Sequence, residues 1–228
     1  MNKRILAVIT SIVLVLILIV LALPYYLGIK AQQSLEEQRI LLSKNAFLTV
    51  EKHEYRRGWF TSEETMLLRF KPTFLAGIQQ QLPDNVRTVL QQPITIVNHI
   101  NHGLFANGIH PVRAYVNTEF QYTPDAKQIL ARFFGQETPV KLNNTINLSG
   151  SGQMRLVIPK FNYEELSGIK INWLGLESII DYTPGFNSFD THTNSLGLNI
   201  ILADKGKVSY ENLLLNSCLL YTSDAADE

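Results

Sequence analysis

Few side chains in this sequence have the types and spacing that a reaction or a metal ion would require. Among the five histidines, His99 and His102 are the closest pair. Three residues apart on a strand, they face opposite sides and are poor candidates to share a metal ion. Glu63 and Glu64 are direct neighbours that diverge on a strand in the same way, so they do not resemble an acid/base pair. These residues predict neither a metal site nor a pair of catalytic carboxylates.

Motifs for nucleotide binding or nucleophilic catalysis are also absent from the sequence. Ser149-Gly150-Ser151-Gly152 is rich in glycine, but no lysine followed by serine or threonine completes a phosphate loop. A bend between two strands is the better interpretation of this run. Residues 1–217 contain no G-x-S-x-G, H-E-x-x-H or cysteine–histidine arrangement. We therefore expect no catalytic residue, no cofactor and no bound metal, and we favour a protein that is not an enzyme.

One motif has the character of a binding surface. Arg56 and Arg57 precede Gly58, Trp59 and Phe60, which places two guanidinium groups beside two large rings. Such a set could bind lipid headgroups or a polyanion. Alternatively, the chain turns at Gly58, the two rings pack into the core and the arginines cap the strand end. We favour core packing. Under the alternative of a binding surface, the candidate site consists of Arg56, Arg57, Trp59 and Phe60.

The position of this motif depends on an N-terminal segment that is suited to a membrane. The nineteen residues from Ile5 to Leu23, centred on Leu14, are apolar except for Thr10 and Ser11. Nineteen helical residues reach about 28 Å, close to the hydrocarbon thickness of a bilayer. The segment is longer than the apolar core of a cleavable signal peptide, which has about 7–15 residues. We favour a retained membrane anchor over a cleaved signal peptide or a buried helix.

Residues at both ends of the apolar run predict its orientation. Lys3 and Arg4 precede it and favour a cytoplasmic N-terminus. Pro24 follows it, and Tyr25 and Tyr26 suit the headgroup region of the membrane. We expect a single-pass protein of the bacterial inner membrane whose bulk lies in the periplasm.

The last eleven residues need a separate explanation. Cys218–Glu228 matches the translation of a common transposase-type sequencing adapter at every residue. We interpret it as an artefact, against the alternative of a genuine acidic tail, and expect the authentic chain to continue past Ser217. Without Asp224, Asp227 and Glu228, 17 acidic residues face 20 basic ones and the net charge is +3 instead of zero. So small a charge gives no reason to expect nucleic acid as a partner.

Helical patterns flank the first predicted strands. Residues 28–45 predict a juxtamembrane helix with a partial apolar stripe. This helix either continues the anchor beyond a kink at Pro24 or packs on the first strands, and a short coiled coil between two copies is a further alternative. Phe74–Leu90 is partly helical and is interrupted at Pro83.

Most of residues 46–217 has the pattern of strands joined by turns. In Arg113–Tyr122, apolar and polar residues alternate, which indicates a sheet with one buried face. Thr123, Pro124 and Gly135 then supply the N-cap, the first-turn proline and the terminating glycine of a short helix. These patterns predict a mainly β domain.

Several short motifs occur along residues 1–217. They are Gly28-x-x-Ala31, Tyr55-x-Arg57-Gly58-Trp59-Phe60-x-Ser62, His102-Gly103, Thr145-x-x-Leu148-Ser149-Gly150-x-Gly152 and Ile171-x-Trp173-x-Gly175-Leu176. In this order they resemble the YdgA-like family of bacterial inner-membrane proteins, whose function is unknown. The resemblance implies an anchored, β-rich periplasmic domain, and it implies no mechanism.

Together, these observations predict a mainly β (β-rich α+β) periplasmic domain with an N-terminal transmembrane helix. We expect a cytoplasmic tip and anchor at residues 1–27 and a juxtamembrane helix at residues 28–45. The β-rich domain follows at residues 46–217, and the artefact occupies residues 218–228. We expect a cell-envelope protein that acts by scaffolding, by binding a partner or by handling lipid along an apolar sheet face. Its first expected partner is the lipid bilayer. The second is an envelope protein, a lipid or a second copy of the chain. The alternative is a periplasmic hydrolase of envelope polymers, which requires a cleft where ionisable side chains converge.

Overall fold

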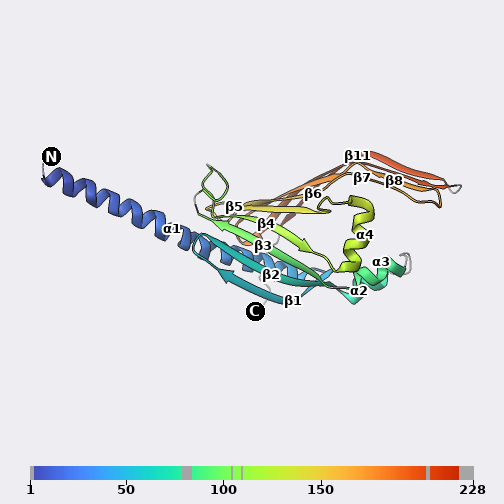
Figure 1. The fold of residues 1–228 in the computed structure, drawn as a ribbon, viewed down its shortest axis with the longest axis horizontal. Helices are drawn as coiled ribbons and strands as arrows, with labels where there is room; N and C mark the ends of the chain where they lie inside the picture. Colours follow the sequence, from blue (N-terminus) through green and yellow to red (C-terminus); the bar gives the residue numbers. More distant parts are fainter. Residues whose placement is uncertain (1–2, 79–83, 104, 109, 204–205, 221–228) are drawn as a thin grey trace.

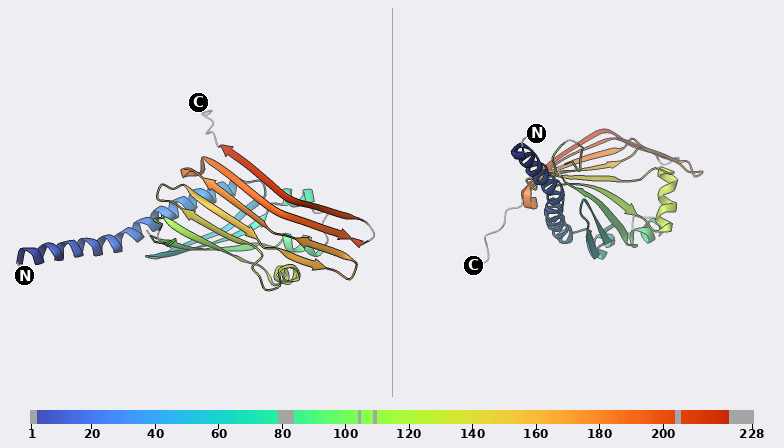
Figure 2. Two further views of the ribbon diagram at one scale, coloured as in Figure 1. Left: turned by 90° about the horizontal axis from the view of Figure 1, so that it is seen from above. Right: turned by 60° about the vertical axis from the view of Figure 1, so that its left-hand side comes forward.

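The computed structural model describes residues 3–78, 84–103, 105–108, 110–203 and 206–220. A long helix, α1, extends away from the rest of the molecule and then runs along one antiparallel β-sheet (Figures 1 and 2). The chain is therefore mainly β with one long N-terminal helix, as the sequence predicts.

The sheet contains eleven strands within the described residues. Their bounds are β1 Leu48–Arg57, β2 Thr61–Phe70, β3 Ile94–His102, β4 Ala114–Gln121, β5 Lys141–Ile146, β6 Gly152–Ile158, β7 Phe161–Glu164, β8 Ile169–Trp173, β9 Leu176–Tyr182, β10 Ser188–Leu202 and β11 Lys207–Leu220. Strands β1 to β6 follow one another in the sheet in chain order, and each pairs with the next in antiparallel fashion. The bend predicted at Ser149–Gly152 lies between β5 and β6.

The later strands form two long hairpins. Strands β6 and β7 pair with β9 and β8, so the four act as one hairpin that is interrupted halfway along. The long strand β10 then pairs with both β9 and β8 on one side and with β11 on the other. Cys218–Leu220, which we predicted to derive from an adapter, belong to β11, and residues 221–228 lie outside the described part of the chain. The adapter interpretation stays a prediction.

Helix α1 runs without interruption from Lys3 to Lys44 and includes Pro24. Residues 28–44 therefore continue the N-terminal helix, and they also pack on the sheet, so these two alternatives hold together. The coiled coil between two copies stays a prediction. Within the described residues, α1 is the one helix long and apolar enough to cross a membrane. Leu14 is exposed and Leu23 is partly covered, whereas the side chain of Ile5 lies outside the described residues. The apolar first half of α1 leaves its surface bare, as a membrane-spanning segment would.

The other helices within the described residues are short. They are α2 Pro72–Ile78, α3 Asp84–Leu90, α4 Pro124–Phe134 and the 3-10 turn η2 Pro184–Phe186. Helix α4 begins as predicted, because the Thr123 hydroxyl accepts a hydrogen bond from the N–H of Ala126, and it ends at Gly135, whose φ is 60°. Helices α2 and α3 match the pattern of Phe74–Leu90, and the interrupting Pro83 lies outside the described residues.

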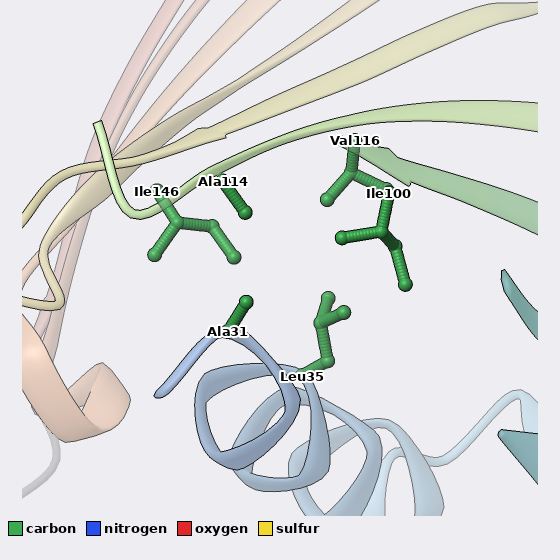
Figure 3. Packing of buried hydrophobic residues seen from close by; sticks show 6 residues of the cluster. All are labelled: Ala31, Leu35, Ile100, Ala114, Val116 and Ile146. Carbon is green, nitrogen blue, oxygen red and sulfur yellow. The ribbon is translucent and has the colours of Figure 1, made fainter. Parts of the chain in front are cut away.

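The second half of α1 packs against one face of the sheet, which we call the inner face. Ala31 and Leu35 of the helix meet the apolar side chains of three central strands, shown in Figure 3: Ile100, Ala114, Val116 and Ile146. The predicted alternation of β4 places Ala114, Val116 and Thr118 on this buried side. In Figure 2 the sheet curls, so that β1–β4 and β8–β11 form two limbs with α4 between them. The inner face is therefore a trough that holds the end of the anchor helix.

Candidate functional site at the junction of anchor and sheet

The helix lies in close contact with the sheet at Gly28. A Cβ atom at this position would lie 2.7 Å from Cε1 of His102, closer than real side chains allow. Glycine is therefore the residue that lets the α1 backbone lie directly on the imidazole ring. Three residues later Ala31 is fully buried, so small residues on one face of α1 permit this close packing.

His102 links the helix to the sheet through both ring nitrogens. Its side chain is only 3% exposed; Nδ1 lies 2.9 Å from the carbonyl oxygen of Pro24, and Nε2 lies 3.1 Å from the Ser62 hydroxyl. A carbonyl can only accept, so Nδ1 carries the proton and Nε2 of the neutral ring accepts from Ser62. Burial lowers the pKa of His102, which keeps the ring neutral. His99 points to the opposite, exposed side, so the prediction that the two histidines face opposite sides of the strand is confirmed.

Trp59 supports the helix where Pro24 weakens its backbone hydrogen bonds. Pro24 has no N–H for the carbonyl of Val20, four residues earlier, and it disturbs the hydrogen bonds of the neighbouring residues as well. In that turn the indole Nε1 of Trp59 donates to the carbonyl oxygen of Leu21 at 2.7 Å. The indole ring also lies 5.1 Å from the ring of Tyr25, measured between centroids. Trp59 thus supplies a donor from outside the helix.

The expectation that Trp59 and Phe60 pack into the core is wrong. Each is 51% exposed. They occupy the turn between β1 and β2, where the N–H of Gly58 donates to the carbonyl of Thr61 at 2.9 Å. This turn lies at the end of the sheet, where α1 passes but no second layer covers the rings. The turn at Gly58 is as predicted.

The two arginines of the motif have different surroundings. The guanidinium carbon of Arg57 lies 5.1 Å from the centroid of the Tyr25 ring, and its nitrogens donate to Tyr25 and Gln32 at 3.3 Å. Arg56 points away from the helix, where its side chain is 72% exposed and pairs with Glu54. The structure therefore brings Arg57, Trp59 and Phe60 together beside α1 and leaves Arg56 in solvent.

A cavity of about 450 Å³ opens between the helix and this turn. Its walls are mainly apolar and include Val20, Leu23, Pro24, Phe60, His102 and Phe105. Leu23 is the last residue of the apolar run, so a bilayer spanned by α1 would place the cavity at the boundary of headgroups and hydrocarbon. We call this cavity and the surrounding residues Arg57, Trp59 and Tyr25 the seam.

A second contact on the other side of α1 was not predicted. Arg113 donates to the Ser34 hydroxyl and to the carbonyl of Leu148, both at 2.8 Å. A Cβ on Gly150 would lie 3.1 Å from the same guanidinium group. Gly28, His102 and Gly150 belong to the motifs that carry the family resemblance. Their place in these motifs was the signal in the sequence that pointed to them. The motifs around Gly28, Trp59 and His102 thus meet at α1.

No group of three or more histidine, cysteine, aspartate or glutamate side chains within the described residues could hold a metal ion.

Comparison with known proteins adds one finding. No curated protein and no solved structure matches the chain. A family model described as "Bacterial protein of unknown function (DUF945)" matches residues 1–225, which include the anchor and every residue of the seam. The chain therefore belongs to the DUF945 family of bacterial proteins of unknown function.

Proposed function

We propose that the protein is a membrane-anchored cell-envelope protein that binds an anionic phospholipid at the seam. The observation that supports this function best is the apolar cavity beside Leu23 and Phe60, at the level where the helix would leave the hydrocarbon. We also propose the YdgA-like assignment, an inner-membrane location and a periplasmic sheet, on the basis of the short motifs and of Lys3 and Arg4 before the anchor.

The cavity suits a lipid acyl chain. Phe60 and Phe105 are large rings that are 51% and 75% exposed, and Val20 beside them is 63% exposed. Covering such surface contributes about 25 cal/mol for each Å² of apolar area. An acyl chain in the cavity would cover all three side chains at once.

Arg57 supplies the preference for an anionic headgroup. Its hydrogen bonds to Tyr25 and Gln32 are long, at 3.3 Å, and they use two of its five N–H donors. The remaining donors can bind a phosphate. One arginine close to an anionic lipid surface contributes about 1 kcal/mol, which is about a five-fold preference over a zwitterionic lipid.

Quenching of tryptophan fluorescence by brominated lipid tests this function. The chain has two tryptophans, so Trp173→Phe leaves Trp59 as the reporter and Trp59→Phe leaves Trp173 in β8. The full chain is placed in phosphatidylcholine vesicles with a small fraction of brominated phosphatidylglycerol or brominated phosphatidylcholine. We expect the anionic lipid to quench Trp59 about five times more effectively than the zwitterionic one, and neither lipid to quench Trp173.

The two neighbouring arginines provide a matched control. In the Trp173→Phe background, Arg57→Gln should remove the preference, whereas Arg56→Gln should keep most of it because Arg56 pairs with Glu54. Equal quenching of Trp59 by both lipids in the parent chain would mean that Trp59 only faces bulk lipid. That result would overturn the proposal.

A further inference from the structure

A second cavity lies farther along α1, on the other side of the packed contact at Ala31 and Leu35. Here the last turns of the helix face the inner surfaces of β1 to β6 across a space of about 220 Å³, which we call the inner chamber. Its walls are largely aliphatic or aromatic, and they include Leu42, Met66, Leu68, Ile96, Phe120 and Leu142. The chamber and the seam share no lining residue.

The floor of the chamber carries a row of buried polar side chains. Glu64, Asn98 and Thr118 stand opposite one another on β2, β3 and β4. Asn98 donates to Glu64 at 2.7 Å, and Thr118 donates to Asn98 at 2.7 Å. The other carboxylate oxygen of Glu64, which is 2% exposed, lies 2.9 Å from Nε2 of His53. Burying polar groups costs free energy even when they are paired, so a row of three within an apolar trough suggests a polar ligand.

Gln38 enters the chamber from the helix side, and its hydrogen bonds are poor. Its amide nitrogen points at the sulfur of Met154 at 3.0 Å, and a thioether is a weak acceptor. Its amide oxygen lies 3.5 Å from the nitrogen of Asn144, at the limit of a hydrogen bond. A ligand with better hydrogen-bonding groups could therefore displace this side chain at little cost.

The chemistry of the chamber selects among lipid-like ligands. Its apolar walls and small volume suit the head group and the first carbons of a single aliphatic chain, the rest of which would extend out of the chamber. Two charged side chains line the chamber. Arg39 is already paired with Glu36, so the carboxylate of Glu64 in the floor is left to repel a second carboxylate or a phosphate. Thr118 keeps acceptor capacity, and the amides of Asn98 and Asn144 carry further N–H groups, which suit a hydroxyl or an ester carbonyl.

We propose that the inner chamber binds a single-chain lipid with an uncharged, hydroxyl-bearing head group, of which a monoacylglycerol is the simplest example. The head group binds the row Glu64, Asn98 and Thr118, and the chain lies along the apolar wall in place of Gln38. This inference does not rest on the seam, because no residue is common to the two cavities.

Photolabelling tests the inference. The full chain in phosphatidylcholine vesicles is incubated with a monoacylglycerol that carries a diazirine in its chain, irradiated and digested, and the labelled peptides are identified by mass spectrometry. We expect saturable labelling of the peptides that contain Leu142 or Met154. Unlabelled monoolein should compete, and oleate, which has the same chain and a charged head, should not.

Variants of the helix and of the floor test separately the space in the chamber and the charge of Glu64. Gln38→Trp should fill the chamber and reduce labelling about ten-fold, whereas Glu37→Trp, on the exposed neighbouring residue, should leave it unchanged. Glu64→Gln keeps the size of the floor and removes its charge, so oleate should then compete. Equal competition by oleate in the parent chain, full labelling of Gln38→Trp, or exclusion of oleate from Glu64→Gln would each overturn the inference. Glu64→Gln keeps the test decisive if Gln38→Trp does not fold.

Discussion

The two ends of the contact between α1 and the sheet are built differently. At the end next to the apolar segment of α1, Gly28 and Ala31 bring the backbones together, and His102 bonds both to the helix and to Ser62. At the other end, Gln38 reaches a thioether and a distant amide across a cavity. The same helix is therefore held firmly just after its apolar segment and loosely near its end.

The difference shows how one helix can serve two roles. Local opening follows local packing and hydrogen bonding, so the last turns of α1 should lift from the sheet at a lower cost than the turns at the seam. Movement of Gln38 and Leu42 would open the inner chamber while His102 and Arg113 keep the anchor in place. Three predictions test this contrast.

The largest effect should come from the close contact at Gly28. Gly28→Ala places a methyl group 2.7 Å from the His102 ring, and overpacking of this kind costs about 2 kcal/mol. Gly77 in α2 is the matched control, because nothing lies within 4 Å of its Cβ position. Gly77→Ala should stabilise the chain by up to about 0.8 kcal/mol. Denaturant unfolding of the full chain in micelles, followed by near-UV circular dichroism, gives both values. A neutral Gly28→Ala would show that α1 and β3 are not tightly packed at this point.

A fall in pH should weaken the contact between α1 and the sheet at His102. Because burial lowers the pKa of His102 in the folded state, the unfolded chain binds its proton at a higher pH than the folded chain. The contribution of the neutral His102 ring to the free energy of unfolding is complete above the pKa of a histidine in the unfolded chain, about 6.5. It declines as the pH falls through the pKa of His102 in the folded chain. The free energy of unfolding should fall by up to about 1.4 kcal/mol for each pH unit in this range. His102→Gln should remove that part of the slope, whereas a change at the exposed His192 should not.

The smallest effect should come from the loose end. Gln38→Leu removes an amide with two poor partners and adds apolar contacts, so stability should be unchanged or rise by about 1 kcal/mol. The unfolding experiment used for Gly28→Ala measures this difference. A loss of more than about 1 kcal/mol would show that Gln38 is a true structural contact and that the two ends are alike.

Local patterns predicted much of this fold. The alternation in Arg113–Tyr122 identified the buried face of β4, and Thr123 and Gly135 marked the ends of α4. The divergence of Glu63 and Glu64 was also predicted, but alternation alone does not say which of the two faces the trough. Those predictions depend on neighbouring residues, whose geometry the backbone fixes.

The candidate site depends on contacts between distant parts of the chain. His102 meets Pro24 and Gly28 because α1 crosses the end of β3, and no local pattern shows where that crossing occurs. Trp59 and Phe60 have the composition of core residues, and only the path of α1 shows that they lie at the edge of the sheet. The family motifs pointed to the correct residues without indicating that a helix joins them.

The continuity of α1 through Pro24 has a mechanical consequence. Its 42 residues form a rod about 63 Å long. Because the contacts of Gly28, His102 and Arg113 fix this rod to the sheet, the sheet cannot swivel about a flexible tether. If α1 spans a bilayer, a tilt of the helix, such as a thinner bilayer would cause, must swing the whole sheet relative to the membrane plane. In a membrane the molecule would then act as a lever whose angle depends on the thickness of the bilayer.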